Sequence, residues 1–104
     1  MDKSDVSLAQ MRTFVRVAER RNLSAVAREM NAGQSTVTRH LQELEDALGV
    51  SLLSRTTRRI TLTDEGSRYY ANCVQILRLV EQSGDEVRGT SSAAAGTVRI
   101  LSLI

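Results

Sequence analysis

Five polar side chains recur along one side of the segment 34–42, and their chemistry suits nucleic-acid recognition. They are Gln34, Ser35, Thr38, Arg39 and Gln42. Amide, hydroxyl and guanidinium groups exchange hydrogen bonds with base edges and phosphates in a major groove. Thr36 and His40 complete the candidate contacts of this segment, and we expect His40 to touch phosphate or solvent. A helical hairpin with a solvated polar face is the alternative interpretation.

Apolar residues at helical spacing place these polar side chains on one helix. Val37, Leu41, Leu44 and Leu48 recur three or four residues apart, and Gly49 follows as a C-cap. A shorter helix before it is predicted to begin at Ser24, which suits an N-cap and is also a candidate DNA contact. Asn31 tolerates the left-handed conformation at its end, and Gly33 can open the next helix. Two such helices with a tight turn predict a helix-turn-helix, a motif that reads DNA.

A short β-hairpin is predicted directly after the second helix. Residues 50–55 and 59–63 alternate apolar and polar side chains, and residues 56–58 form the tip. The hairpin contains Arg55, Arg58 and Arg59, and residues 51–59 include no acid. Arginine at such a place neutralises phosphates or enters a narrow minor groove. A hairpin beside a recognition helix is a wing, so the three arginines are candidate DNA contacts.

The first helix of the chain is predicted to support this motif. Ser7 and Gln10 have the spacing of a capping box. The expected apolar stripe consists of Leu8, Met11, Phe14, Val15 and Ala18. Phe14 is the only phenylalanine, and we expect it at the centre of the core.

A long helix over residues 64–89 is predicted after the wing, because Thr63 suits an N-cap and two acids open the helix. Its apolar seam consists of Tyr69, Cys73, Ile76, Val80 and Val87, widened by Tyr70 and Leu77. At about 1.5 Å per residue such a helix extends roughly 37 Å, more than a small winged domain covers. We therefore expect a second chain to pair with the seam. A stripe that folds back on its own domain is the alternative.

Catalytic and metal sites are not indicated. His40 is the only histidine and Cys73 the only cysteine, and the spacings of metal ligands, of a phosphate-binding glycine loop and of a catalytic carboxylate pair are missing. A cysteine in an apolar helical stripe is more often a packing residue than a redox sensor. We therefore predict no enzyme activity, no metal and no cofactor.

The composition fits one small domain with an aliphatic core. The chain has 104 residues and a net charge of +2, and every cation except Lys3 is arginine, whose planar fork suits phosphate and guanine. No signal peptide is visible, and no apolar run approaches the roughly 20 residues that a membrane span needs. These features, with a single cysteine, predict a cytoplasmic protein without membrane contact.

The last residues differ in composition from the long helix. Residues 90–96 are small, as in a flexible linker, and residues 97–104 contain the run VRILSLI, which is typical of a buried strand in a parallel sheet. No further strand follows in the sequence. We therefore expect the chain to have been cut from a longer protein.

With these segments in view, the chain resembles the LysR-type family of bacterial transcriptional regulators. The resemblance runs through SLAQMRTFVRVAERRNLS, QSTVTRHLQELEDALGVSLLSR and LTDEG, in that order. It implies a mainly α fold, with a winged helix-turn-helix of three helices and a two-stranded wing over residues 1–63 and a dimerisation helix after it. It also implies main DNA-reading positions at Gln34, Ser35, Thr38 and Arg39, and a wing contact at Arg58.

The resemblance implies partners and leaves alternatives. The partners are double-stranded DNA, a second copy of the chain or a higher homo-oligomer, and a small-molecule effector that would bind a missing C-terminal domain. The chain departs from the family pattern where Asn31 replaces Gly, Ala32 a bulkier apolar residue, and Gly33 the usual Ser or Thr cap of the recognition helix. A self-contained winged-helix repressor of another family and a protein-interaction module with an incidental basic wing are the competing interpretations.

Overall fold

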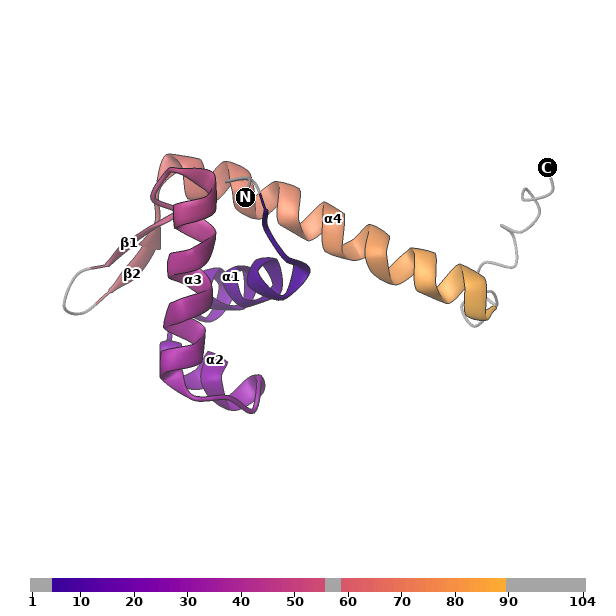
Figure 1. The fold of residues 1–104 in the computed structure, drawn as a ribbon, viewed down its shortest axis with the longest axis horizontal. Coiled ribbons are helices and arrows are strands. Elements are labelled where there is room, and N and C mark those ends of the chain that lie inside the picture. Colours follow the sequence, from indigo (N-terminus) through magenta and orange to yellow (C-terminus); the bar gives the residue numbers. More distant parts are fainter. Residues whose placement is uncertain (1–4, 56–58, 90–104) are drawn as a thin grey trace. The chain divides into compact units, whose positions relative to one another are not determined.

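The computed structural model describes residues 5–55 and 59–89, and it is mainly helical (Figure 1). The elements are α1 (Leu8–Arg20), α2 (Leu23–Glu29), α3 (Gln34–Leu48), β1 (Leu53–Arg55), β2 (Ile60–Leu62) and α4 (Asp64–Arg88). The chain divides into two compact units, residues 1–74 and 75–104, and each is described by itself below. The predicted order of three helices, a two-stranded wing and a long helix is confirmed.

Helix α1 begins with the predicted capping box and buries most of the expected stripe, together with Thr13 and Val17. The amide of Gln10 donates to Ser7 Oγ at 3.1 Å, and the amide of Ser7 donates to Gln10 Oε1 at 3.1 Å. The buried residues are Thr13, Phe14, Val17 and Ala18, whereas Leu8 is exposed and Val15 is half-buried. The helix therefore turns a face centred on Phe14 and Val17 to the core, with Met11 and Val15 packed against it, and of the expected stripe only Leu8 is exposed.

The core of the first unit lies where α1, α2 and α3 meet the base of the wing. Its members with no more than 1% exposure are Phe14, Val17, Val26, Val37, Leu41, Leu44, Leu52 and Cys73. The predicted stripe of α3 is confirmed at Val37, Leu41 and Leu44, which are its buried residues. Fixing this stripe against α1 and α2 determines which side of α3 remains open.

The turn between α2 and α3 has the expected backbone but a different cap. Asn22 is the N-cap of α2, and its Oδ1 accepts from the amide of Ala25 at 3.0 Å. The prediction of Ser24 as N-cap is therefore wrong, because the cap lies two residues earlier, at Asn22, and the helix already begins at Leu23. Asn31 adopts the left-handed conformation with φ 56°, as predicted. Gly33 opens α3 without a side-chain cap.

The wing is a short antiparallel pair. β1 and β2 pair Leu53 with Leu62, Ser54 with Thr61 and Arg55 with Ile60. The strands are shorter than the predicted segments 50–55 and 59–63, because residues 50–52 connect α3 to the wing and Thr63 already caps the next helix. The predicted tip, including the candidate contact Arg58, lies outside the described residues.

The first turns of α4 pack on the chain's own domain. The amide of Gly66 donates to Thr63 Oγ1 at 2.9 Å, which confirms Thr63 as the N-cap. The Tyr69 ring lies 5.7 Å from that of Phe14, and the Tyr70 hydroxyl donates to Glu19 Oε2 at 2.6 Å. Cys73 is completely buried in the core cluster. This part of the predicted seam therefore folds back, which was the alternative interpretation.

Burial also sets the ionisation of this cluster. It is the largest cause raising the pKa of Tyr69 to about 12, and the neighbouring Cys73 adds to the shift. Burial likewise raises the pKa of the Cys73 thiol, although the hydrogen bond with Tyr69 works against it. A buried thiol with a raised pKa is a packing residue rather than a nucleophile.

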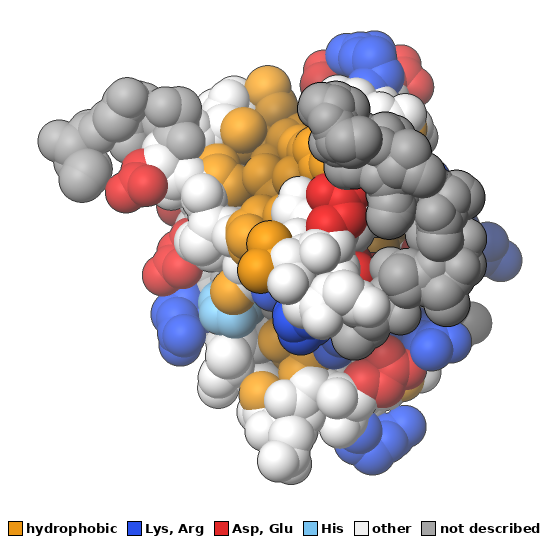
Figure 2. All heavy atoms as spheres, turned by 90° about the vertical axis from the view of Figure 1, so that its right-hand side faces the viewer, with side chains coloured by type: hydrophobic (Ala, Val, Ile, Leu, Met, Phe, Trp, Pro, Cys, Tyr) orange, Lys and Arg blue, Asp and Glu red, His pale blue; other side chains and the backbone are white. Residues whose placement is uncertain are grey.

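The second part of α4, residues 75–88, keeps its apolar side chains open. Ile76 is 39% exposed, Leu79 61% and Val87 88%, while Leu77 and Val80 are half-buried. Leu79 was not part of the predicted seam. Figure 2 shows one face of the molecule, on which hydrophobic side chains lie at the surface among charged and polar ones. Residues 90–104, with the predicted linker and strand, lie outside the described residues.

Candidate nucleic-acid interface

The polar side of the first half of α3 is open. Gln34, Ser35 and Arg39 are exposed, and Thr36 and Thr38 are half-buried. The buried residues of this helix, Val37 and Leu41, hold the opposite side against the core. The structure thus keeps these five sequence-predicted residues in the open part of the helix, next to its uncapped start, whereas His40 and Gln42 have partners elsewhere.

Gln34 and Ser24 are joined across the turn. The Gln34 Nε2 donates to Ser24 Oγ at 2.6 Å, and both residues are exposed. Ser24 lies in the first turn of α2, so this contact ties the start of α3 to the start of the preceding helix. The sequence predicted both residues as DNA contacts but did not predict their mutual contact.

His40 differs from the other polar residues of α3 because it turns toward α1. Its Nδ1 lies 2.8 Å from Thr13 Oγ1, and Thr13 is completely buried. The Thr13 hydroxyl also reaches the carbonyl of Ala9 at 3.0 Å. A proton on His40 Nδ1 lets Thr13 accept from histidine and donate to Ala9, which satisfies the buried hydroxyl. His40 is half-buried and joins two helices, so only part of its ring is available to a phosphate.

Arg39 is tied only loosely to its own helix. Its Nε lies 3.7 Å from Glu43 Oε2, and both side chains are more than half exposed. Glu43 also accepts from Gln10 Nε2 at 3.2 Å through its other oxygen. Exposed ion pairs of this kind contribute about 0–1 kcal/mol. A phosphate can therefore replace the carboxylate as the partner of Arg39 at small cost.

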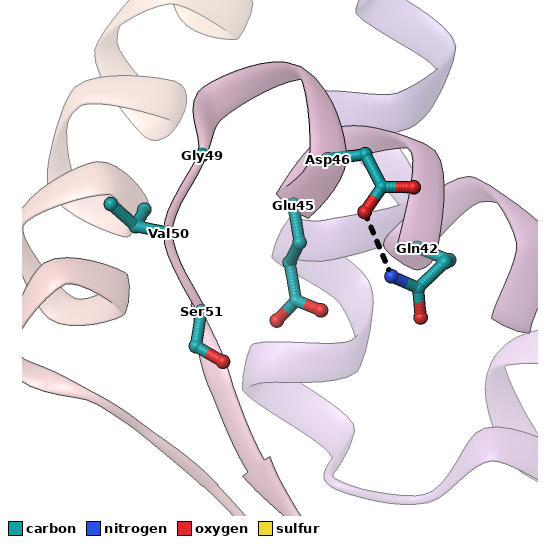
Figure 3. A pocket seen from close by; sticks show the side chains of 6 residues that line it. All are labelled: Gln42, Glu45, Asp46, Gly49, Val50 and Ser51. Carbon is teal, nitrogen blue, oxygen red and sulfur yellow. Dashed lines mark hydrogen bonds between the residues drawn. The ribbon is translucent and has the colours of Figure 1, made fainter.

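The second half of α3 is acidic and unsuited to phosphate. Gln42, Glu45 and Asp46 line an open hollow of about 600 Å³ with Gly49, Val50 and Ser51 of the following loop (Figure 3). Asp46 Oδ1 accepts from Gln42 Nε2 at 3.0 Å, as the dashed line in Figure 3 marks. The last turn contains no basic residue, and a helix C-terminus is itself negative. Phosphates are therefore directed to the first half of α3.

Glu45 fixes the base of the wing to this helix. Its Oε2 accepts from the amide of Leu52 at 2.8 Å and from that of Leu53 at 3.1 Å. Thr63 holds the same segment from the other strand, since its Oγ1 donates to the carbonyl of Ser51 at 2.7 Å. The direction of β1 from α3 is thus determined by Glu45, which the sequence interpretation did not single out, and by Thr63, which it predicted only as a helix cap. An acid a few residues before a predicted strand is too common a pattern to reveal the role of Glu45.

Two of the three wing arginines lie in the described residues. Arg55 ends β1, Arg59 lies just before β2, and both are exposed. Their placement after the Glu45 contact puts positive charge on the element that adjoins α3. Within residues 5–55 and 59–89, no group of three His, Cys, Asp or Glu side chains could hold a metal ion.

We expect Glu45→Ala to lower the free energy of unfolding by about 2 kcal/mol, because two amides of buried residues lose a charged acceptor. Asp46→Ala is the matched control, since it removes an exposed carboxylate from the same turn and is expected to change stability by no more than about 0.5 kcal/mol. Urea unfolding of both variants measures the difference. Equal losses would contradict the assigned role of Glu45.

A family model supplies the observation that decides the relationship. Residues 8–67 match the model for bacterial regulatory helix-turn-helix proteins of the lysR family. The chain belongs to the LysR family. The matched range includes α1, α2, α3 and the wing, so the resemblance noted in the sequence is confirmed, and this chain contains the family's DNA-binding domain.

Known LysR-family proteins agree with this assignment. The HTH-type transcriptional regulator DmlR of Escherichia coli is 40% identical over 95 residues, which cover 91% of this chain and 31% of DmlR. The DNA-binding domain of CbnR in complex with DNA is 37% identical with a TM-score of 0.77, covering 83% of this chain and 99% of that domain. That of BenM with catB site 1 DNA is 30% identical with a TM-score of 0.78, covering 84% and 97%.

The matches cover different fractions of these proteins. It spans about a third of the length of DmlR and nearly all of the two isolated DNA-binding domains. Among the helices in the described ranges, none is both long and apolar enough to cross a membrane.

Proposed function

We propose that this LysR-family chain binds a specific operator in double-stranded DNA and thereby regulates transcription. The first half of α3 enters the major groove, and the wing contacts the backbone or the adjacent minor groove. The observation that carries the proposal is the division of α3 into an open polar half, Gln34 to Arg39, and an acidic half that begins at Glu43. Only the first half complements DNA.

The contacts divide into base-reading and backbone-holding groups. Gln34, Ser35 and Thr38 present groups that suit base edges, with Thr36 beside them. Arg39, Arg55, Arg58 and Arg59 hold phosphates, and His40 adds a smaller contact. Ser24 belongs to this surface through its hydrogen bond with Gln34.

We further propose that the chain acts as a homodimer or as part of a higher homo-oligomer. Ile76, Leu79 and Val87 leave an apolar side of α4 open in the single chain, and a partner helix would cover it together with Leu77 and Val80. Tyr69 and Tyr70 lie at the edge of the chain's own core, where they limit the start of that contact.

The remaining assignments depend on this function. A DNA-binding regulator works where the chromosome is, which places it in the cytoplasm, and it needs neither catalysis nor a cofactor. A small-molecule effector would bind in the part of the regulator that this chain does not include. A protein-interaction module, the alternative function, would not require arginines on an element held beside a polar helix.

The expected test separates base reading from phosphate holding. Gln34→Ala should weaken binding to a duplex selected by the wild-type chain by about 1–3 kcal/mol and change binding to random duplex little. Gln42→Ala is the matched control, because it truncates the same amide at the boundary of the acidic half of α3. The hydrogen bond to Asp46 separates Gln42 from the polar side chains with which the sequence grouped it. Titrations over a salt series should show affinity falling steeply with salt for all three chains.

Two results would contradict the proposal. A salt-independent affinity would favour the protein-interaction module, because phosphate neutralisation requires counterion release. Equal losses from Gln34→Ala on both duplexes would remove the base-reading assignment while leaving DNA binding intact.

A further inference from the structure

We propose that Ser24 is a positioning residue that fixes the Gln34 carboxamide so that it reads adenine. The inference rests on the proposed function, since it specifies how one residue of the DNA-binding surface is held. It starts from the 2.6 Å hydrogen bond from Gln34 Nε2 to Ser24 Oγ, which joins the first turns of α2 and α3.

Ser24 is available for this contact because it does not cap its own helix. Asn22 occupies the N-cap and bonds the amide of Ala25. Ser24 is exposed, and Gln34 is the side-chain partner that the structure gives it. A hydroxyl that is not needed for folding of α2 is therefore directed across the turn.

The start of α3 needs such a contact. Gly33 provides no side-chain cap, and the first turn contains no acid to favour the helix dipole. The amides of Thr36 and Val37 both reach the carbonyl of Gly33, at 3.1 and 3.3 Å. Gln34 is the first residue of this weakly held turn, so a bond to α2 restricts both its backbone and its long side chain.

The chemistry of the restricted carboxamide selects the base. One N–H of Nε2 is used by Ser24, which leaves the second N–H and Oε1 as a neighbouring donor and acceptor. Adenine presents the complementary pair, the N7 acceptor and the N6 amino donor, in the major groove. Guanine presents two acceptors there and would oppose Oε1. A carboxamide that is already held in the free protein also loses less rotational freedom when the complex with DNA forms.

The experiment uses Ser24→Ala, Gln34→Ala, the double variant and Ser24→Thr on a duplex selected by the wild-type chain. The second duplex differs from the selected one at the A·T pair that Gln34 is proposed to read, which is the pair whose replacement leaves the affinity of Gln34→Ala unchanged. The third duplex has a random sequence. We expect Ser24→Ala to lose about 3- to 10-fold in affinity on the selected duplex and little on the random one. The double variant should bind no more weakly than Gln34→Ala alone, and Ser24→Thr should bind as the wild type.

Each other outcome overturns the proposal in a recognisable way. Equal losses on selected and random duplexes would make Ser24 a phosphate contact. Additive losses in the double variant, or unchanged discrimination of the A·T pair in Ser24→Ala, would show that Gln34 does not depend on Ser24. Failure to select any duplex would defeat the proposed function itself. Thermal unfolding of each variant separates these results from a loss of fold.

Discussion

The paired substitution Ile76→Asp and Leu79→Asp is expected to lower operator affinity by about 100-fold or more, the scale on which avidity is lost. Both side chains are exposed in the single chain, so the carboxylates can remain in water when the chain is monomeric. In the proposed dimer they would be buried against apolar neighbours without partners, which is costly. Sedimentation and duplex titration measure the two effects together.

The matched control makes the same change in net charge in the same helix but on another side of α4. Arg78→Asp makes the same change in net charge with one substitution, at an exposed position of α4 that lies off the side shared by Ile76, Leu79 and Val80. This control should sediment and bind as the wild type. Two findings would contradict the dimer proposal: a dimeric Ile76→Asp, Leu79→Asp variant, or a monomeric one that binds the operator at full strength.

Gly66→Ala is expected to lower the free energy of unfolding by about 3 kcal/mol, the upper end of what overpacking typically costs. An added Cβ would lie 2.0 Å from the carbonyl oxygen of Leu52, which is backbone rather than a movable side chain. That oxygen accepts the amide of Thr63 at 3.0 Å, and the amide of Gly66 is itself bonded to Thr63 Oγ1. Neither side of the contact can move without breaking the base of the wing.

Gly84→Ala is the control in the same helix, and its expected effect has the opposite sign. The nearest atoms to an added Cβ are the ends of the Arg88 side chain at 3.1 and 3.3 Å, which is flexible and exposed. Replacing an interior helical glycine by alanine should then stabilise α4 by up to about 1 kcal/mol. Thermal unfolding and hydrogen exchange compare the two variants. A stabilising Gly66→Ala would show that the close approach to Leu52 is misplaced.

Local patterns predicted most of the elements because their causes are local. Ser7 and Gln10 are close enough in sequence to cap one helix, and Asn31 and Gly49 supply the left-handed conformations that end α2 and α3. The stripe of α3 follows from helical periodicity alone. The candidate DNA contacts on α3 follow from the same periodicity, because a helix with one buried side must leave the other side open.

Contacts between distant residues could not be predicted in this way. Asn22 caps α2 in place of the predicted Ser24, because asparagine and serine two residues apart have similar capping strength and the local pattern does not decide between them. The Thr13 hydroxyl meets His40 of another helix, and Glu45 accepts from the amides of Leu52 and Leu53 at the base of the wing. Each of these pairs is formed only when separate helices or strands meet.

The sequence by itself determined the order of elements, the polar side of the recognition helix and the basic character of the wing, because periodicity, caps and charge are properties of neighbouring residues. Only the tertiary structure decided that Cys73 belongs to the core of its own domain while Ile76 and Leu79 remain open. It also decided that Gly66 must lack a side chain and that Ser24 meets Gln34. The physical reason is that burial and hydrogen bonding across a turn depend on how helices pack, and packing brings together residues that no local pattern connects.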